Sequence, residues 1–410
     1  MPETTGGAGT DRMNLLFDYI VVGKGLIGSA AARVLSGMAP RVAVVGPDEP
    51  EDQSRHDGVF ASHYDQGRLT RLIARNPIYS KVSERAINNY PYLEEASGIR
   101  FHFPVGALTA ITPDVPDGHV KSPIETARRL HREHTLYEMG DRSWRTKFPY
   151  IDFPDNYSVL FEPAPAGYVN PRDLLRAQLT IGEANGLTTI RETTVATRRS
   201  GDVIELRTAE GGAYRTKNLL VATGAFANAY DVLPRKLAVE PETEIVLLAE
   251  VSEADARERE NVPTVMYLID DPEIRDIYMT PPIRYPDGRF YVKLGANTVY
   301  DTHPLELEDI GDWFRKGDSD RCKPALERAV RSLWPGLRFL SFETKRCILT
   351  RTKSTYPMID QVDDGLYVAV AGNGGAAKGS DAWGTIAAAL VTEGTWPDEL
   401  PRDLFRAEFA

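Results

Sequence analysis

Hydrophobic and polar positions along the chain follow patterns that predict a mixture of strands and helices. An apolar run over residues 17–22 ends in glycines, residues 26–36 repeat apolar side chains at helical spacing, and a second apolar run covers 41–45. A strand, a helix and a second strand in this order are typical of a βαβ unit. The chain is therefore predicted to open with such a unit.

Later segments return to this α/β pattern, with one interruption. The predicted elements of this kind are a helix over 170–184, strands over 188–198, 203–208, 218–226 and 365–372, and a helix over 380–393. Between 232 and 342 the chain changes to alternating strands, such as 244–251, 277–280 and 289–294, followed by a charged helix near 320–334. The interruption indicates a second domain.

These changes divide the chain into two domains of the α/β class. The Rossmann-like dinucleotide-binding domain would be assembled from 15–100, 165–232 and 345–410, and the mixed-sheet substrate domain from 101–164 and 233–344. Residues 1–14 are polar and rich in Gly and Thr, and we expect a disordered lead-in there. A ligand would lie between the two domains.

Composition limits the class of protein. The 410 residues are 42% hydrophobic and 26% charged, which is typical of a soluble globular protein, and no apolar run approaches the roughly 18 residues of a membrane span. The net charge of −11 argues against a nucleic-acid partner. Two cysteines, Cys322 and Cys347, and a start unlike a signal peptide favour the cytoplasm. No third ligand accompanies the paired histidines at 131 and 134, so we predict no metal.

The glycine turn after the first strand predicts a dinucleotide site. In Gly23-Lys-Gly-Leu26-Ile27-Gly28, the first two glycines let the backbone approach a pyrophosphate at the positive end of a helix. Gly28 lets the helix pack closely on the strand. The alternative is a glycine-rich turn without a ligand.

The acid that usually holds the adenosine ribose is displaced in this sequence. Gly46 and Pro47 stand at the end of the second strand, so Asp48 or Glu49 would have to reach back to the ribose. Solvated loop acids are the alternative. No basic residue follows at once, which disfavours NADP.

Seven segments in order resemble one enzyme family. They are residues 23–28, 61–71, 166–171, 222–225, 292–295, the strand around Cys347, and 372–379. Together they resemble the D-amino-acid-oxidase superfamily of FAD enzymes, and within it the branch of monomeric sarcosine oxidase and pipecolate oxidase. The resemblance covers nearly everything after residue 15 and implies a two-domain flavoprotein oxidase.

The resemblance implies FAD bound covalently through Cys347, with Arg68 close to the flavin ring. Lys345 and Arg346 would lower the pKa of the thiol, whose thiolate is the reactive form. A small buried side chain is the alternative for Cys347. Further FAD contacts are expected from Leu26, Ile27, Asp48, Ser62, His63, Val195, Gly224, Gly372, Gly374, Gly375 and Lys378.

The resemblance also implies that Arg71 and Lys378 hold a substrate carboxylate. A guanidinium suits this role because its planar fork makes paired hydrogen bonds, although Arg75 nearby leaves a solvated basic patch as the alternative. Leu349 and Asn297 replace an active-site tyrosine and histidine of sarcosine oxidase. The substrate is therefore expected to be a cyclic imino acid, a larger N-alkyl amino acid or a free amino acid.

The resemblance further implies that Lys293 promotes the reaction of reduced flavin with oxygen, a role that suits a fixed positive charge because it stabilises a developing anion. The alternative is a lysine that faces solvent. The alternating pattern of this strand places Tyr291 and Lys293 on the same face, and by pattern alone that face could be the exposed one. The loop over 372–379, before a helix capped by Ser380 or Asp381, suits negative charge on reduced flavin.

Together these features predict an FAD-dependent oxidase of CH–NH or CH–NH₂ donors. Hydride would pass to flavin N5 and oxygen would become hydrogen peroxide. No strong general base is visible, so the amine would bind neutral. A flavin dehydrogenase or monooxygenase, and a non-catalytic dinucleotide-binding sensor, are the alternatives. The partners expected are an amino or imino acid and oxygen, in a monomer or small homo-oligomer.

Overall fold

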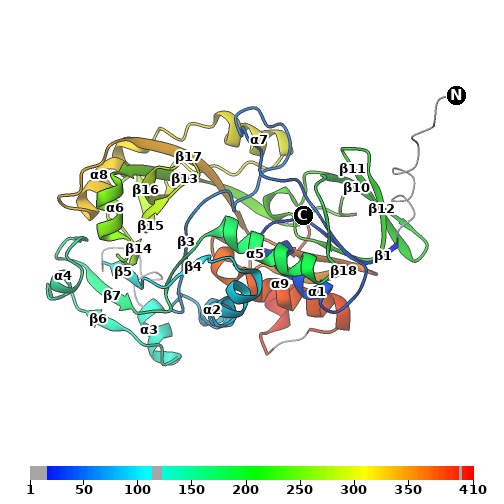
Figure 1. Cartoon of the computed structure of the whole chain (residues 1–410), viewed down its shortest axis with the longest axis horizontal. Coiled ribbons are helices and arrows are strands. Elements are labelled where there is room, and N and C mark those ends of the chain that lie inside the picture. The colour runs from blue at the N-terminus through cyan, green and yellow to red at the C-terminus, as the bar shows by residue number, and fades with distance from the viewer. Residues whose placement is uncertain (1–15, 113–121, 397–398) are drawn as a thin grey trace.

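Two broad sheets covered by helices form the molecule (Figure 1). The computed structural model describes residues 16–112, 122–396 and 399–410. The lead-in predicted for 1–14 lies outside these ranges. The architecture confirms the predicted α/β fold class, while the boundaries proposed for the two domains stay a prediction.

The first sheet is built around parallel strands. Strand β1 pairs in parallel with β2 and β12, and β12 also pairs in parallel with β19. The strands are β1 (Leu16–Val22), β2 (Val42–Val45), β9 (Thr188–Ile190), β10 (Thr194–Ser200), β11 (Val203–Thr208), β12 (Ala213–Val221), β18 (Met358–Asp363) and β19 (Leu366–Val370). The order β10-β11-β12-β1-β2-β9, with β19 and β18 beyond β12, confirms the βαβ opening.

Four helices bury one face of this sheet. They are α1 (Leu26–Ser36), α2 (Pro77–Ser97), α5 (Pro171–Ala184) and α9 (Ala376–Glu393). Helix α1 packs on α9 and α5 in a core that includes the fully buried Tyr90 and Trp383. The side chain of Asn170 caps α5 by accepting hydrogen bonds from two backbone N–H groups, as its type favours.

Three sequence predictions for this part are corrected. The strand predicted over 188–198 is two strands at opposite ends of the sheet, interrupted where Glu192 accepts hydrogen bonds from the hydroxyls of Thr208 and Tyr214. The strand predicted over 218–226 ends at Val221, before a short 3-10 helix. Helix α9 begins at Ala376 rather than Ser380, because Gly375 takes the cap position without a side-chain bond.

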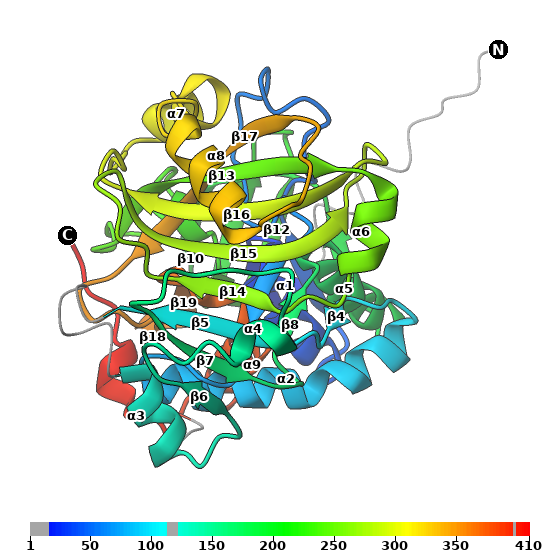
Figure 2. The same cartoon turned by 90° about the vertical axis from the view of Figure 1, so that its left-hand side faces the viewer.

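The second sheet is almost entirely antiparallel (Figure 2). Its order is β17-β13-β16-β15-β14-β5-β7-β6. Within the described part of this second sheet, the β14–β5 pair alone is parallel. The strands are β5 (Ala107–Ile111), β6 (Thr135–Tyr137), β7 (Ser158–Glu162), β13 (Glu240–Val251), β14 (Thr264–Tyr267), β15 (Ile274–Arg284), β16 (Phe290–Thr298) and β17 (Phe342–Arg351).

Both faces of the second sheet are buried. Val292 and Leu294 of β16 join the core that includes α8 (Lys323–Leu333), whereas Tyr291 and Lys293 alternate onto the opposite face. The shared face of Tyr291 and Lys293 is as predicted. The solvent-facing alternative is wrong, because Lys293 is 0% exposed.

A small sheet and further helices complete the described fold. Strand β8 (Gly167–Val169) pairs antiparallel with β3 (Arg68–Thr70) and β4 (His102–Phe103), and Arg68 is opposite Val169. The further helices are α3 (Ser122–Arg129), α4 (Trp144–Lys147), α6 (Glu253–Arg259) and α7 (Leu307–Lys316).

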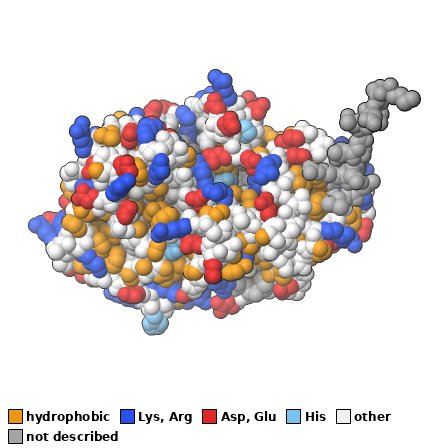
Figure 3. Space-filling model, viewed as in Figure 1, with side chains coloured by type: hydrophobic (Ala, Val, Ile, Leu, Met, Phe, Trp, Pro, Cys, Tyr) orange, Lys and Arg blue, Asp and Glu red, His pale blue; other side chains and the backbone are white. Residues whose placement is uncertain are grey.

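Acidic and basic side chains are interspersed on the face seen in Figure 3. No helix in the described ranges is long and apolar enough to cross a membrane. Within the same ranges, no group of three or more His, Cys, Asp or Glu side chains is arranged to hold a metal ion.

Candidate active site

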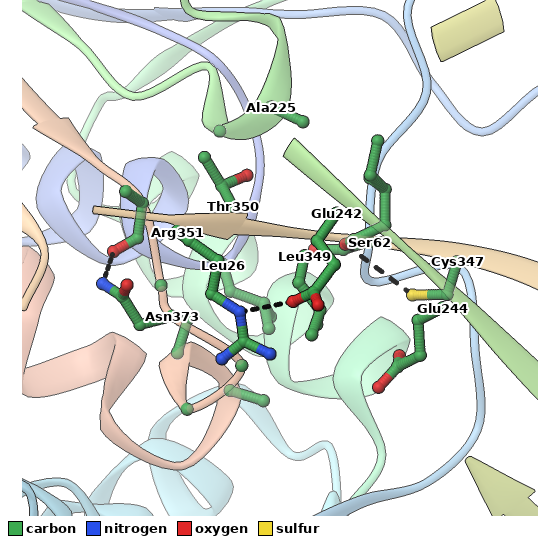
Figure 4. Close-up of a pocket in the computed structure, with 18 of the residues that line it drawn as sticks. Leu26, Ser62, Ala225, Glu242, Glu244, Cys347, Leu349, Thr350, Arg351 and Asn373 are labelled. Carbon is green, nitrogen blue, oxygen red and sulfur yellow. Dashed lines mark hydrogen bonds and ion pairs between the residues drawn. The ribbon is translucent and has the colours of Figure 1, made fainter. Parts of the chain in front are cut away.

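A cavity of about 1220 Å³ is lined by residues of both large sheets. It extends from the glycine turn after β1 to the inner face of the second sheet (Figure 4). The predicted site residues on its lining are Gly23, Gly25, Leu26, Ile27, Ser62, His63, Arg68, Arg71, Gly224, Asn297, Cys347, Leu349, Gly372, Gly374, Gly375 and Lys378. Gly28, Asp48, Val195 and Lys293 do not line it.

The glycine turn forms an open cradle at one end. A Cβ at Gly23 would overlap the Ala222 carbonyl, and a Cβ at Gly28 would overlap the Gly23 carbonyl oxygen, so both glycines are needed for close packing. A Cβ at Gly25 would meet nothing within 4 Å. Helix α1 starts at this open position without a side-chain cap. Its first backbone N–H groups are therefore available for an anion.

The two acids after β2 are held by basic side chains. Asp48 pairs with Lys24 and, at 3.0 Å, with Arg191. Glu49 accepts two hydrogen bonds of 2.7 and 2.6 Å from Arg172. The contact of Asp48 with the adenosine ribose thus stays a prediction. To make it, Asp48 would have to release or share its ion pairs with Lys24 and Arg191.

Val195 lies beside the cavity rather than on it. The preceding Thr194 lines the cavity, and its Oγ1 is buried without a hydrogen-bond partner. The Oγ1 of Thr223, which also lines the cavity, is likewise buried without a hydrogen-bond partner. Buried hydroxyls are normally satisfied, so these two groups suit a polar ligand in the cradle. With the open space at Gly25, they fit the diphosphate and ribose of FAD.

Cys347 faces the cavity from β17 and is opposite Glu244 of β13. Figure 4 shows the thiol and this carboxylate side by side. Arg68 approaches Sγ at 3.6 Å. Burial, followed by the charge of Glu244, raises the pKa of Cys347 to about 11, although Arg68 and Lys293 oppose this. The lowering expected from Lys345 and Arg346 is not found, because Arg346 instead donates to the Gly317 carbonyl at 2.6 Å.

Two glutamates of β13 line the cavity and were missed by the sequence analysis. Glu242 is opposite Leu349, and the Arg351 Nε donates to its carboxylate at 2.5 Å (Figure 4). Glu244 accepts a 3.0 Å hydrogen bond from the Tyr278 hydroxyl, and burial raises its pKa. Acids at every second position from Glu240, in an otherwise apolar strand, are the signal that could have identified them.

Lys293 lies behind the cavity lining, where a buried acid holds it. Its ammonium is 2.6 Å from Asp65, donates to the Gly67 carbonyl at 2.7 Å, and lies 4.7 Å from the centre of the Tyr278 ring. Asp65 also pairs with Arg68 and accepts a 2.7 Å hydrogen bond from Tyr285.

The balance of charge around Lys293 depends on this acid. Burial and the charge of Arg68 hold the pKa of Lys293 well below its usual value. Glu244 and Cys347 raise it, and the Asp65 carboxylate at 2.6 Å also favours the protonated form. Asp65 belongs to a segment recognised in the sequence, but no spacing rule relates it to a lysine more than 200 residues away.

A second buried acid fixes the loop that carries Arg71. Glu162 accepts hydrogen bonds from the backbone N–H groups of Leu72 at 2.5 Å and Ile73 at 3.1 Å. The Arg71 side chain then reaches Thr109 Oγ1 at 3.4 Å. Lys378, in the first turn of α9, lines the same part of the cavity, and burial followed by the charge of Arg71 lowers its pKa to about 7.

Two other side chains give the cavity polar character. Burial lowers the pKa of His63 to about 3, with Arg172, Lys24 and Arg68 adding to the effect, so its imidazole is neutral at physiological pH. Asn297 donates to Asp276 at 2.8 Å, while its Oδ1 is buried without a partner. A neutral ring and an unpaired amide oxygen can both accept a hydrogen bond from a ligand.

The chain is similar over most of its length to a curated protein and to solved structures. It is 24% identical over 390 residues to monomeric sarcosine oxidase from Bacillus sp. (strain NS-129), covering 93% of this chain and 94% of that protein. The solved structure of NikD, described as an unusual amino acid oxidase essential for nikkomycin biosynthesis, superposes with a TM-score of 0.77. It is 20% identical, and the match covers 96% and 98% of the two chains.

L-proline dehydrogenase from P. horikoshii shows the same fold, with a TM-score of 0.67 and 17% identity over 95% of this chain and 96% of that one. The family model described as FAD dependent oxidoreductase matches residues 18–390. That range includes both large sheets and the cavity between them. The chain belongs to the FAD dependent oxidoreductase family.

Proposed function

We propose that this enzyme oxidises the C–N bond of an amino or imino acid and transfers the electrons to oxygen, forming hydrogen peroxide. The observation that carries the proposal is one cavity that joins a dinucleotide cradle to a carboxylate site at Arg71 and Lys378. The names of the similar proteins, a sarcosine oxidase, an amino acid oxidase and a proline dehydrogenase, support this class of substrate.

Bound FAD would supply the hydride acceptor. In our proposal the residues of the chain position the substrate: Arg71 and Lys378 hold its carboxylate, and the fork of Arg71 fixes its orientation. The amine binds in its neutral form, since a lone pair must be free when the C–H bond breaks. Asn297 Oδ1 is an unpaired acceptor on the wall that suits an N–H of the substrate.

Lys293 is proposed to supply the positive charge that oxygen reduction requires. It lies one layer behind Tyr278 and shares Asp65 with Arg68, which does line the cavity. A charge fixed in a water-excluded site stabilises a developing anion without reorganisation. Asp65 would act as a positioning residue that keeps this lysine in place.

Cys347 is proposed to hold the flavin covalently. Its thiol faces the cavity, and Arg68 at 3.6 Å suits the thiolate that the attachment requires. Acid precipitation of the holoenzyme tests this: flavin should stay with the protein, and leave it in Cys347→Ala. Flavin found wholly in the supernatant of a fully loaded wild-type protein would refute the bond. A cytoplasmic monomer or small homo-oligomer also stays part of the proposal.

Anaerobic mixing with amino and imino acids tests the function itself. We expect bleaching of the flavin, followed on admission of oxygen by one peroxide per substrate. The similarity to a proline dehydrogenase favours a second candidate, a dehydrogenase, in which bleaching occurs but oxygen restores the colour only slowly. Failure of a broad panel to bleach the flavin would favour the non-catalytic alternative.

A further inference from the structure

The substrate end of the cavity contains more positive charge than one carboxylate requires. Arg71, Arg75 and Lys378 all line it, and among the described residues none of them has a carboxylate within ion-pair distance. Two other arginines that line the cavity do have an acidic partner. Arg351 is 2.5 Å and Arg275 is 4.0 Å from the Glu242 carboxylate.

The three unpaired cations are close enough to influence one another. Burial is the main cause that lowers the pKa of Arg71, and Arg75 adds to it. Burial likewise lowers the pKa of Arg75; the charge of Asp276 opposes this effect, and the charge of Arg351 adds to it. A partly buried guanidinium without an anion is costly, because desolvation is not offset. Such a cost is typical of a ligand site.

The acids that face these cations are already engaged. Glu162 gives both carboxylate oxygens to backbone N–H groups, and burial raises its pKa. Asp276 accepts from the Asn297 amide at 2.8 Å. Asp276 acts on Arg75 through its charge, but the two side chains form no ion pair. The positive charge is therefore left for the substrate.

We infer that the substrate carries a second carboxylate, which Arg75 binds while Arg71 and Lys378 hold the first. The substrate class is an amino or imino dicarboxylic acid. This inference rests on the proposed function, which it deepens by naming the substrate class. It follows from the ion pairs: one carboxylate shared by Arg71 and Lys378 leaves the Arg75 guanidinium without an ion-pair partner among the described residues.

Dicarboxylates without an amine test the second site separately from turnover. Succinate, glutarate and adipate would be compared with butyrate, pentanoate and hexanoate, in which a methyl group replaces one carboxylate. Binding to the holoenzyme is read from the perturbation of the flavin spectrum. We expect at least one dicarboxylate to bind tenfold or more tightly than its partner, and this preference to be lost in Arg75→Gln.

Two further variants make the result specific. Arg75→Lys should restore part of the preference, whereas Arg257→Gln, which removes an arginine from exposed helix α6, should leave it unchanged. Melting temperatures of the holoenzymes show whether each variant is folded. Equal affinities within every pair of acids, or a preference that survives in Arg75→Gln, would overturn the inference.

Failure of the proposed function would look different. The dicarboxylate preference and its loss in Arg75→Gln would persist, but no amino or imino acid would bleach the flavin under anaerobic conditions. Conversely, N-methylalanine could be oxidised rapidly, with a kcat/KM no lower than that of N-methylaspartate or N-methylglutamate. This result would support the proposed function and contradict the inference that the substrate carries a second carboxylate.

Discussion

The two ends of the cavity are built from different parts of the chain. The cradle at Gly23 and Gly25 is formed by backbone groups of six consecutive residues, and it stays open because its glycines carry no side chains. The opposite end consists of charged side chains from separate strands and loops, such as Arg71, Glu242 and Lys378. The first kind of site depends on space and the second on charge balance. Variants should therefore fail in different ways at the two ends.

Filling the cradle should have the largest effect. Gly28→Ala places a Cβ against the Gly23 carbonyl oxygen, so we expect the free energy of unfolding of the apoprotein to fall by about 3 kcal/mol. Gly25→Ala meets nothing within 4 Å, so stability should change by less than about 0.5 kcal/mol while FAD incorporation falls at least tenfold. Denaturant unfolding and flavin content measure the two effects. Equal destabilisation by both variants would contradict a ligand site at Gly25.

Removing charge at the other end should spare the fold. In Lys293→Met, reoxidation of reduced flavin by oxygen should slow by about 100-fold, since a preorganised charge is lost, while flavin reduction by substrate changes little. Stopped-flow absorbance separates the two half-reactions. Lys345→Met is a matched control, because this lysine lies on β17 of the same sheet, beyond β13, with its ammonium 5.5 Å from the Tyr285 ring. Unchanged reoxidation in Lys293→Met would show that its charge has no such role.

Asp65→Asn tests the charge balance more finely. Without this carboxylate, only the charges of Glu244 and Cys347 oppose burial and Arg68, so the pKa of Lys293 should fall further. A lysine loses its charge above its pKa, so reoxidation in the variant should decline at lower pH than in the wild type. Stopped-flow rates from pH 6 to 10 measure the shift. Tyr285→Phe removes only a hydrogen bond to Asp65 and should shift the profile less.

The smallest expected effect concerns Lys378. Its pKa of about 7 means that the side chain is charged below pH 7 and neutral above it. The affinity for butyrate, whose carboxylate is ionised throughout, should fall about three- to tenfold from pH 6 to 8.5. Lys378→Met should remove this dependence and leave the weaker binding due to Arg71. A pH-independent affinity in the wild type would contradict the shifted pKa.

The sequence was sufficient for the cradle and for most of the residues around it. Gly23, Gly25 and Gly28 form a local motif, and their spacing was enough to predict the turn and the helix start. The alternation of side chains along β16 predicted that Tyr291 and Lys293 share one face. The segments quoted for the family brought Arg68, Arg71, Cys347 and Lys378 to one region, although their roles stay predictions.

The charge networks could not be predicted, because strand pairing decides them. Glu244 and Cys347 are 103 positions apart and become neighbours only through the register of β13 and β17. The pairing of Lys293 with Asp65 likewise depends on how the segment before β3 packs on β16 of the second sheet. A sequence shows that such charges exist but not which of them neutralise one another.

One crossing of the chain between the two sheets lies directly on the cavity. After β17 the chain passes into β18, and Asn373 holds the start of this passage: its N–H donates to Thr350 and its side chain accepts from the Thr352 N–H, both at 2.9 Å. Thr350, Thr352 and Asn373 also line the cavity. A substitution that loosens this crossing should therefore change the shape of the ligand site as well as the link between the sheets.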